Sequence, residues 1–139
     1  MNKTLAILIA LATAMFAVAA QADPARDAIV AKLAAEAKAA DSAFAGFSAA
    51  RGNAFFRASH TGGTAETPSC TSCHGATPQD VGKTRANKAI APMAVSKTPD
   101  RFTDADKVTL WFDRNCKGVL GRVCTALEKG DFITFMAGQ

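Results

Sequence analysis

Residues 70–74 read Cys-Thr-Ser-Cys-His, which is a C-x-x-C-H motif. In this motif the two thiols form thioether bonds to a haem, and the histidine binds the haem iron on one side. We therefore expect one covalent haem c, attached through Cys70 and Cys73, with His74 as the proximal ligand. The iron has a second axial position. The identity of the residue at this second position decides whether the protein is an electron carrier or binds a small ligand.

The first 22 residues have the composition of a secretory signal peptide. Lys3 supplies a short positive start, an apolar run follows, and residues 20–22 read Ala-Gln-Ala, a small-residue cleavage site. The apolar run is too short for a stable membrane span. We therefore predict a cleaved signal peptide over residues 1–22, one periplasmic domain over residues 23–139, and no integral membrane segment after cleavage.

Two cysteines, Cys116 and Cys124, lie outside the motif. An exported chain folds in an oxidising compartment, which favours a disulfide between them. A zinc site made of all four cysteines is the alternative. The signal peptide and the histidine directly after Cys73 both favour haem over zinc.

The formal net charge of +4 is mildly basic. The sequence has no long Lys/Arg run and no interleaved aromatics, so it carries no signature of nucleic-acid binding. Lys83, Lys88 and Lys97 follow the haem motif, in a region that we expect to edge the haem. They could form a basic patch for an acidic partner, and an ordinary solvated loop is the alternative.

Helical patterns dominate the domain, and no stretch alternates as a strand would, so we predict an all-α fold. Asp23 and Pro24 favour the start of an Ala-rich helix that runs to about Ala45. A second helix is expected around Ser48–Ala58, and residues 75–99 are expected to be mostly irregular.

Two capping boxes predict the later helices. One spans Thr103–Asp106 and precedes an apolar face with spacing i, i+3, i+4, i+7, formed by Val108, Trp111, Phe112 and Asn115. Chain breaks are expected at Gly118 and Gly121. The second box, Thr125–Glu128, predicts a terminal helix to about Met136.

This order of elements resembles the class I c-type cytochromes, here with an additional N-terminal helix. Gly52, with Phe55 and Phe56, extends the likeness, because a glycine and aromatics let the early helix cross the last helix closely. The resemblance implies that a proline carbonyl after the motif orients the proximal histidine, and Pro92 is the candidate. Trp111 and Phe112 are expected to wall the haem pocket.

Three residues compete for the second axial position. Met93 follows Pro92 in an irregular apolar segment, where methionine is usually core filler packed near the haem. His60 lies in a polar loop, and an exposed, unbound role is the alternative for it. Asn115 lies on the apolar helix face directly before Cys116, and a C-cap role is its alternative. We expect Met136 to pack the last helix.

From Thr67 onward the chain resembles the SHP-type cytochromes c, a family of periplasmic monohaem proteins. Matching segments are found at 67–75, 90–94, 98–104, 111–116, 121–125 and 128–131, with shorter matches at 51–52 and 61–63. The pair R-N-C (114–116) and G-R-V-C (121–124) is the most specific of these matches. Met93 departs from the family, where leucine is more usual.

The resemblance implies that Asn115 is the sixth ligand and that Cys116 pairs with Cys124. It also implies release of the asparagine on reduction, transient binding of diatomic gases such as oxygen by the ferrous haem, and a dihaem cytochrome c as electron partner. A conventional electron carrier with Met93 or His60 on the iron is the alternative function. A redox activity that consumes oxygen or nitric oxide is left open, although the sequence reveals no general acid for it.

Overall fold

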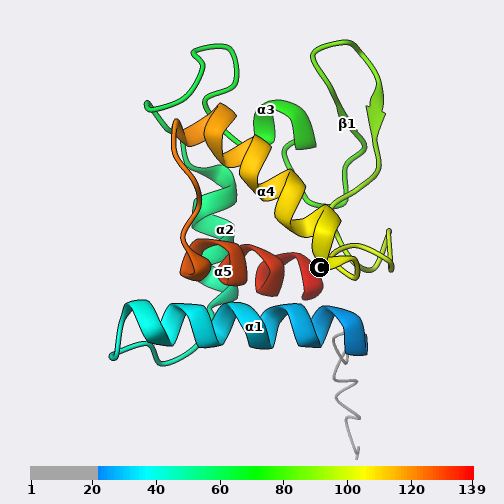
Figure 1. Ribbon diagram of the computed structural model, residues 1–139. Coiled ribbons are helices and arrows are strands. Elements are labelled where there is room, and N and C mark those ends of the chain that lie inside the picture. Colours follow the sequence, from blue (N-terminus) through cyan, green and yellow to red (C-terminus); the bar gives the residue numbers. More distant parts are fainter. Residues whose placement is uncertain (1–21) are drawn as a thin grey trace, which may run out of the picture.

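The structure is a computed structural model that describes residues 22–139, and its elements are mostly helical (Figure 1). In chain order they are α1 (Pro24–Ala40), α2 (Ala49–Arg57), α3 (Thr71–His74), β1 (Gly82–Lys83), β2 (Ala89–Ile90), α4 (Ala105–Leu120) and α5 (Ala126–Ala137). The predicted signal peptide lies outside the described residues except for Ala22. Within them, no helix is both long and apolar enough to cross a membrane.

Helix α1 begins as predicted and ends earlier than predicted. The Asp23 side chain accepts hydrogen bonds from the backbone N–H groups of Ala25 and Arg26, and Pro24 occupies the first helical position. The helix stops at Ala40 rather than near Ala45. The reason is Asp41, which adopts an extended backbone and accepts the N–H of Ala43 through its own carboxylate, an alternative to continuing the helix.

The α2–α5 crossing is the most extensive helix contact in the described chain. A Cβ atom at Gly52 would lie 2.0 Å from the carbonyl oxygen of Asp131, so only glycine permits this approach. The predicted role of Gly52 is therefore confirmed. Arg51 in α2 also pairs with the buried carboxylate of Asp131 in α5, with Nε and Oδ2 2.6 Å apart. Figure 1 shows α1 running alongside α5, on the side of α5 away from α4.

The hydrophobic core lies between α5 and the helices around it. Phe132 of α5 makes edge-to-face contacts with Phe56, Phe102 and Phe112, at centroid distances of 6.1, 6.1 and 5.5 Å. Met136 is fully buried in the same core, so the prediction that it packs the last helix is confirmed. Burial of each such side chain contributes about 1.5–3 kcal/mol.

Helix α4 differs from the prediction at both ends. Its N-cap is Asp104, whose side chain accepts the N–H of Lys107, whereas the Thr103 hydroxyl donates to the carbonyl of Asp100. The predicted break at Gly118 is wrong, because the helix runs on to Leu120. It ends at Gly121, where φ is +70°, a conformation that glycine adopts without strain.

The remaining elements are a terminal helix and a short hairpin. Helix α5 begins with the predicted box, in which the Thr125 and Glu128 side chains each accept a backbone N–H of the other residue. Strands β1 and β2 pair antiparallel, with Gly82 opposite Ile90. The all-α prediction missed this hairpin because two-residue strands are too short to show an alternating pattern.

Candidate haem site

The C-x-x-C-H motif forms one helical turn. Cys70 is the N-cap of α3, and its carbonyl accepts the N–H groups of Cys73 and His74 at 3.3 and 3.1 Å. Residues at i, i+3 and i+4 lie on one side of a helix, so both thiols and the imidazole share a side of this turn. Neither thiol is in a disulfide, and burial raises the pKa of the Cys70 thiol to about 11.

Strand β1 supports this turn through a glycine. A Cβ atom at Gly82 would lie 2.2 Å from the carbonyl oxygen of Cys73 and 2.9 Å from Cα of His74. Any side chain at this position would push the hairpin away from α3. The backbone of β1 therefore fixes one side of the motif, and the opposite side stays available to a ligand.

The two ring nitrogens of His74 have different surroundings. Nδ1 is buried and is the one buried side-chain nitrogen or oxygen in residues 22–139 without a hydrogen-bond partner. Nε2 is not buried in this way, so it is the nitrogen that an iron could reach. Burial, with a smaller contribution from the charge of Arg101, lowers the pKa of His74 to about 4. The ring is therefore neutral near pH 7, which is the form that binds metals.

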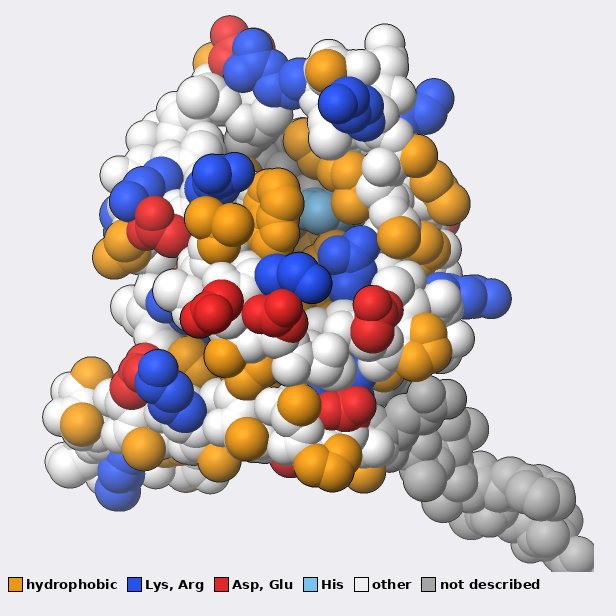
Figure 2. All heavy atoms as spheres, turned by 45° about the vertical axis from the view of Figure 1, so that its right-hand side comes forward, with side chains coloured by type: hydrophobic (Ala, Val, Ile, Leu, Met, Phe, Trp, Pro, Cys, Tyr) orange, Lys and Arg blue, Asp and Glu red, His pale blue; other side chains and the backbone are white. Residues whose placement is uncertain are grey.

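The space-filling view shows a hollow on the side of the molecule that carries the hairpin (Figure 2). A histidine ring lies in the hollow, hydrophobic side chains border it, and Lys and Arg side chains stand around its rim. These surroundings fit a haem, which has a large apolar ring and two anionic propionates. The accessible Nε2 of His74 and the two free thiols of the motif fit the same group.

The predicted hydrogen bond between Pro92 and His74 is absent from the described structure. The carbonyl oxygen of Pro92 instead accepts hydrogen bonds from Thr98 Oγ1 at 2.9 Å and Arg101 Nε at 3.1 Å. Sequence reasoning singled out neither Thr98 nor Arg101 for a role. Both residues lie in segment 98–104, which matches the SHP-type cytochromes, and nothing else in the sequence indicated their role. A hydrogen bond from a side chain to a backbone carbonyl six or nine residues earlier produces no recognisable sequence pattern.

Met93 is 7% exposed and belongs to the hydrophobic core. This placement agrees with the filler role that we favoured for it. His60 is half-buried rather than exposed, because its ring packs on Phe55 with centroids 5.4 Å apart, and its Nε2 lies 3.4 Å from the Phe55 carbonyl oxygen. Both competing ligands are thus engaged in packing.

Asn115 lies in the interior of α4, five positions before its last residue. The C-cap alternative is therefore wrong, since Gly121 takes that role. The Asn115 side chain is exposed, and it makes no hydrogen bond within residues 22–139. The next residue, Cys116, is buried and forms a disulfide with Cys124, which excludes a zinc site made of all four cysteines.

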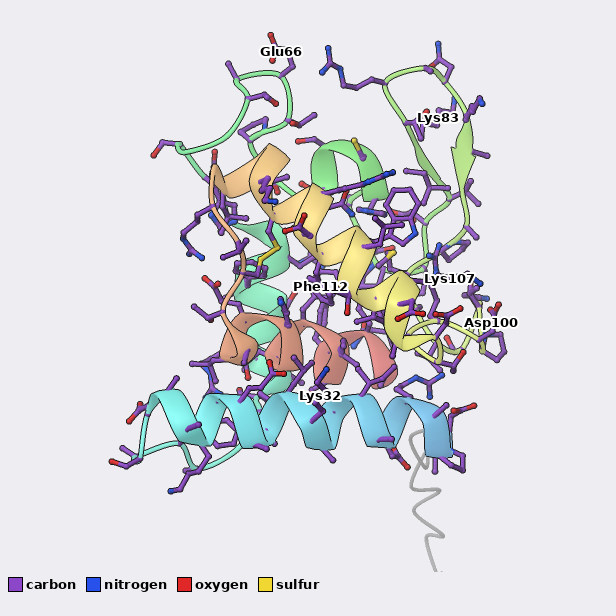
Figure 3. The ribbon with its side chains drawn as sticks, in the orientation of Figure 1. Lys32, Glu66, Lys83, Asp100, Lys107 and Phe112 are labelled. Atoms are coloured by element: carbon purple, nitrogen blue, oxygen red, sulfur yellow. A yellow bond between two sulfur atoms is a disulfide. The ribbon has the colours of Figure 1, made fainter. Side chains whose placement is uncertain are left out.

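The predicted apolar face of α4 is divided between two environments. Phe112 is buried and, with Cys116 and Leu120, faces the core, and Figure 3 shows it between α4 and α5. Trp111 is 52% exposed and carries the Arg114 guanidinium 5.7 Å from its ring centroid. Trp111 and Asn115 are four residues apart, so they lie together on the same exposed side of the helix.

Comparisons with known proteins place the chain among haem proteins. The family described as "Domain of unknown function (DUF1924)" matches residues 42–136. The cytochrome c-type protein SHP of Cereibacter sphaeroides is 53% identical over 91 residues, which cover 66% of this chain and 70% of that protein. Cytochrome c'' of Methylophilus methylotrophus is 36% identical over 86 residues, covering 61% of this chain and 60% of the relative.

Two solved structures share the fold. One, described as oxidized SHP, an oxygen binding cytochrome c, superposes with a TM-score of 0.75 at 46% identity and covers 82% of this chain and 96% of its own. Oxidized cytochrome c'' from Methylophilus methylotrophus gives a TM-score of 0.70 at 32% identity, with 81% and 92% coverage. The prediction of a small, mostly helical cytochrome c-like fold is confirmed by these similarities.

Proposed function

This chain belongs to the SHP-type c-type cytochromes, and from that premise we propose that it is a periplasmic monohaem protein that binds small diatomic ligands such as oxygen. We further propose that it exchanges electrons with a partner cytochrome, for which a dihaem cytochrome c is the candidate. The description of the SHP structure as an oxygen binding cytochrome supports the choice of ligand.

The residues that would hold the haem are those of the α3 turn. Cys70 and Cys73 would form the thioether bonds, and His74 would bind the iron through Nε2, the nitrogen left accessible by the fold. The haem supplies an iron that changes between ferric and ferrous states and can bind a diatomic molecule at an open axial position. The apolar side chains that border the hollow would keep bulk water away from a haem bound there.

The placement of Asn115 is the observation that carries the proposal. An exposed amide without a hydrogen bond, inside a helix where asparagine does not act as a cap, is free to serve as a ligand. An amide oxygen is a weak, hard donor that suits ferric iron better than ferrous iron. Asn115 would therefore hold the second axial position in the oxidised protein and leave it on reduction, opening a site.

The disulfide next to Asn115 supports a controlled release. Cys116 is buried and tied to Cys124, so the backbone of α4 on the C-terminal side of the ligand is anchored to the segment before α5. With the helix held in this way, Asn115 would leave the iron by rotation of its side chain rather than by movement of α4. Trp111, on the same exposed side, would form part of the wall beside the released position.

The binding of carbon monoxide to the ferrous protein tests this function. We expect the wild type to bind it readily and Asn115→His to lose affinity at least tenfold, because imidazole stays on ferrous iron. Met93→Leu and His60→Gln serve as controls and should bind as the wild type does. A wild type that refuses carbon monoxide until Met93 or His60 is replaced would instead identify a conventional electron carrier.

A further inference from the structure

The loop between α2 and α3 lies directly against the C-terminal end of α4 (Figure 1). A Cβ atom at Gly62 would lie 2.1 Å from the carbonyl oxygen of Leu120, and one at Gly63 would lie 2.1 Å from the carbonyl oxygen of Gly118. The backbone N–H of Thr64 donates a hydrogen bond to the same Gly118 carbonyl, at 2.8 Å. The loop and the helix therefore meet backbone to backbone, with no side chain between them.

Glycine is required on the loop side of this contact for space. Neither Gly62 nor Gly63 has a positive φ, so their backbone conformation would accept other residues. Gly121, on the helix side, has a φ of +70°, and its Cβ atom would lie 2.0 Å from the carbonyl oxygen of Gly62. A side chain at Gly62 or Gly63 would therefore separate the loop from α4.

The other end of the loop is tied to α2 and leads into the haem motif. The N–H of His60 donates to the carbonyl of Pro68 at 2.7 Å, which closes the loop on itself. Ser69 Oγ donates to the carbonyl of Phe56 in α2 at 3.3 Å, and the next residue is Cys70. A shift of the loop against α4 would therefore be passed directly to the motif turn.

Helix α4 and the motif turn α3 are not joined by an extensive contact of their own. The main backbone contacts between elements of the described chain join α2 with α5, α1 with α5, α3 with β1, and β1 with β2. The loop contact is therefore a direct link between α4 and the polypeptide that enters α3. It lies close to the proposed ligand, because Asn115 and Gly118 are three residues apart in α4, about 4.5 Å along the helix axis.

We propose that Gly62 and Gly63 are positioning residues, which set the distance between α4 and the haem-binding turn and so bring Asn115 within reach of the iron. This inference rests on the proposed function, since it needs Asn115 as the ligand. It assigns to the loop before the motif the spacing between the two sides of the haem.

The spacing matters because an amide oxygen is a weak ligand. A Cβ atom at position 63 would have to move from 2.1 Å to at least 3.0 Å from the Gly118 carbonyl oxygen, so the loop and the helix would separate by about 1 Å. Bonds between a metal and its ligands vary by only about 0.2 Å. A weak donor could not pull α4 back across this gap, and Asn115 would no longer reach the iron.

Gly63→Ala is the direct test, made on the protein with its haem attached. We expect its ferric optical and electron-spin-resonance spectra to lose the ligand signature of the wild type and to match those of Asn115→Ala. The affinity of the ferrous form for carbon monoxide should stay unchanged, because Asn115 has already left the iron in that form.

Two further alanine variants serve as matched controls. Gly118→Ala adds a Cβ atom in the same part of α4, where it meets no atom within 4 Å, and should keep the wild-type ferric spectrum. Gly52→Ala forces an equally close contact, 2.0 Å from the carbonyl oxygen of Asp131, but between α2 and α5. It should lower stability and keep the wild-type ferric spectrum, which separates positioning of the ligand from a general loss of stability.

Hydrogen exchange of the wild-type protein tests the contact independently of the folding of Gly63→Ala. The N–H of Thr64 should exchange at least about a hundredfold more slowly than that of Glu66, an exposed residue of the same loop. Equal exchange rates overturn this inference, as does a wild-type ferric spectrum in Gly63→Ala. Both results leave the proposed function intact, whereas identical ferric spectra of the wild type and Asn115→Ala overturn the proposed function and this inference together.

Discussion

Asn115 shows how a single residue can be unfavourable for the helix that contains it. It lies inside α4, exposed and without a hydrogen bond in the part of the chain that the structure describes. Asparagine in a helix interior is less favourable than alanine by about 0.5 kcal/mol, because its side chain stabilises competing turns. Neither capping nor packing compensates for this cost, and the proposed ligation of the iron would give the residue a reason to be there.

Replacement of Asn115 by alanine should therefore stabilise the reduced protein. We expect the free energy of unfolding of the ferrous form, measured by denaturant titration, to rise by about 0.5 kcal/mol. Thr109→Ala is the control, since Thr109 is exposed in the same helix and should give a similar gain without changing the ferric spectrum. A destabilised ferrous Asn115→Ala protein would contradict release of the amide on reduction.

At the scale of elements, the closest packing is made by residues without side chains. Gly52 lets α2 approach the backbone of α5, and Gly82 lets β1 approach the motif helix α3. Gly118 has a different setting, because a Cβ atom there would meet no atom within 4 Å. Gly52 and Gly82 are therefore needed for close backbone contacts, whereas Gly118 is not.

Alanine substitutions separate these roles. Gly52→Ala should lower the free energy of unfolding by about 2–3 kcal/mol, because its Cβ would overlap the carbonyl of Asp131 in a packed core. Gly118→Ala should raise it by about 1 kcal/mol, since alanine is the better helix former and space is available. Thermal or denaturant unfolding measures both. Equal effects at the two positions would show that the α2–α5 contact does not depend on Gly52.

Local patterns predicted much of these elements. The haem turn and the α5 box follow from short-range sequence rules, and the Cys116–Cys124 pair from cysteine count and compartment. The Gly52 crossing was predicted from the resemblance to class I cytochromes. The predicted end of α1 was wrong because the turn at Asp41 ends this helix earlier. The predicted break at Gly118 was wrong because α4 tolerates this glycine in its interior. The loop around Pro92 was also beyond prediction, since it depends on Arg26, a residue 75 positions from Arg101.

At the scale of the whole molecule, positive charge is concentrated on the hairpin side. Residues 81–99 contain four cations and no acidic residue. Lys83, Arg85 and Lys88 are exposed in or between the two strands, beside the hollow, and Figure 3 shows Lys83 on the hairpin and Lys32 at the far end, on α1. Lys97, also exposed, lies in the loop after β2. This distribution suits an acidic partner that approaches the haem edge.

Charge reversal on the hairpin tests this docking surface. Lys83→Glu with Lys88→Glu should slow electron exchange with an acidic redox partner at least tenfold at low ionic strength, and added salt should reduce the difference. Lys32→Glu with Lys38→Glu makes the same change in net charge on α1 and should have little effect. A rate that responds equally to both pairs, or to neither, would remove the hairpin as the docking site.

In the proposed function, Asn115 binds ferric iron opposite His74 and releases it on reduction. The most direct measurement compares optical and electron-spin-resonance spectra of ferric and ferrous wild type with those of Asn115→Ala, with and without carbon monoxide. We predict a ferric ligand signature that disappears in Asn115→Ala, and a high-spin ferrous form of both proteins that binds carbon monoxide. Low-spin spectra of both proteins in both oxidation states, with no carbon monoxide binding, would contradict the account.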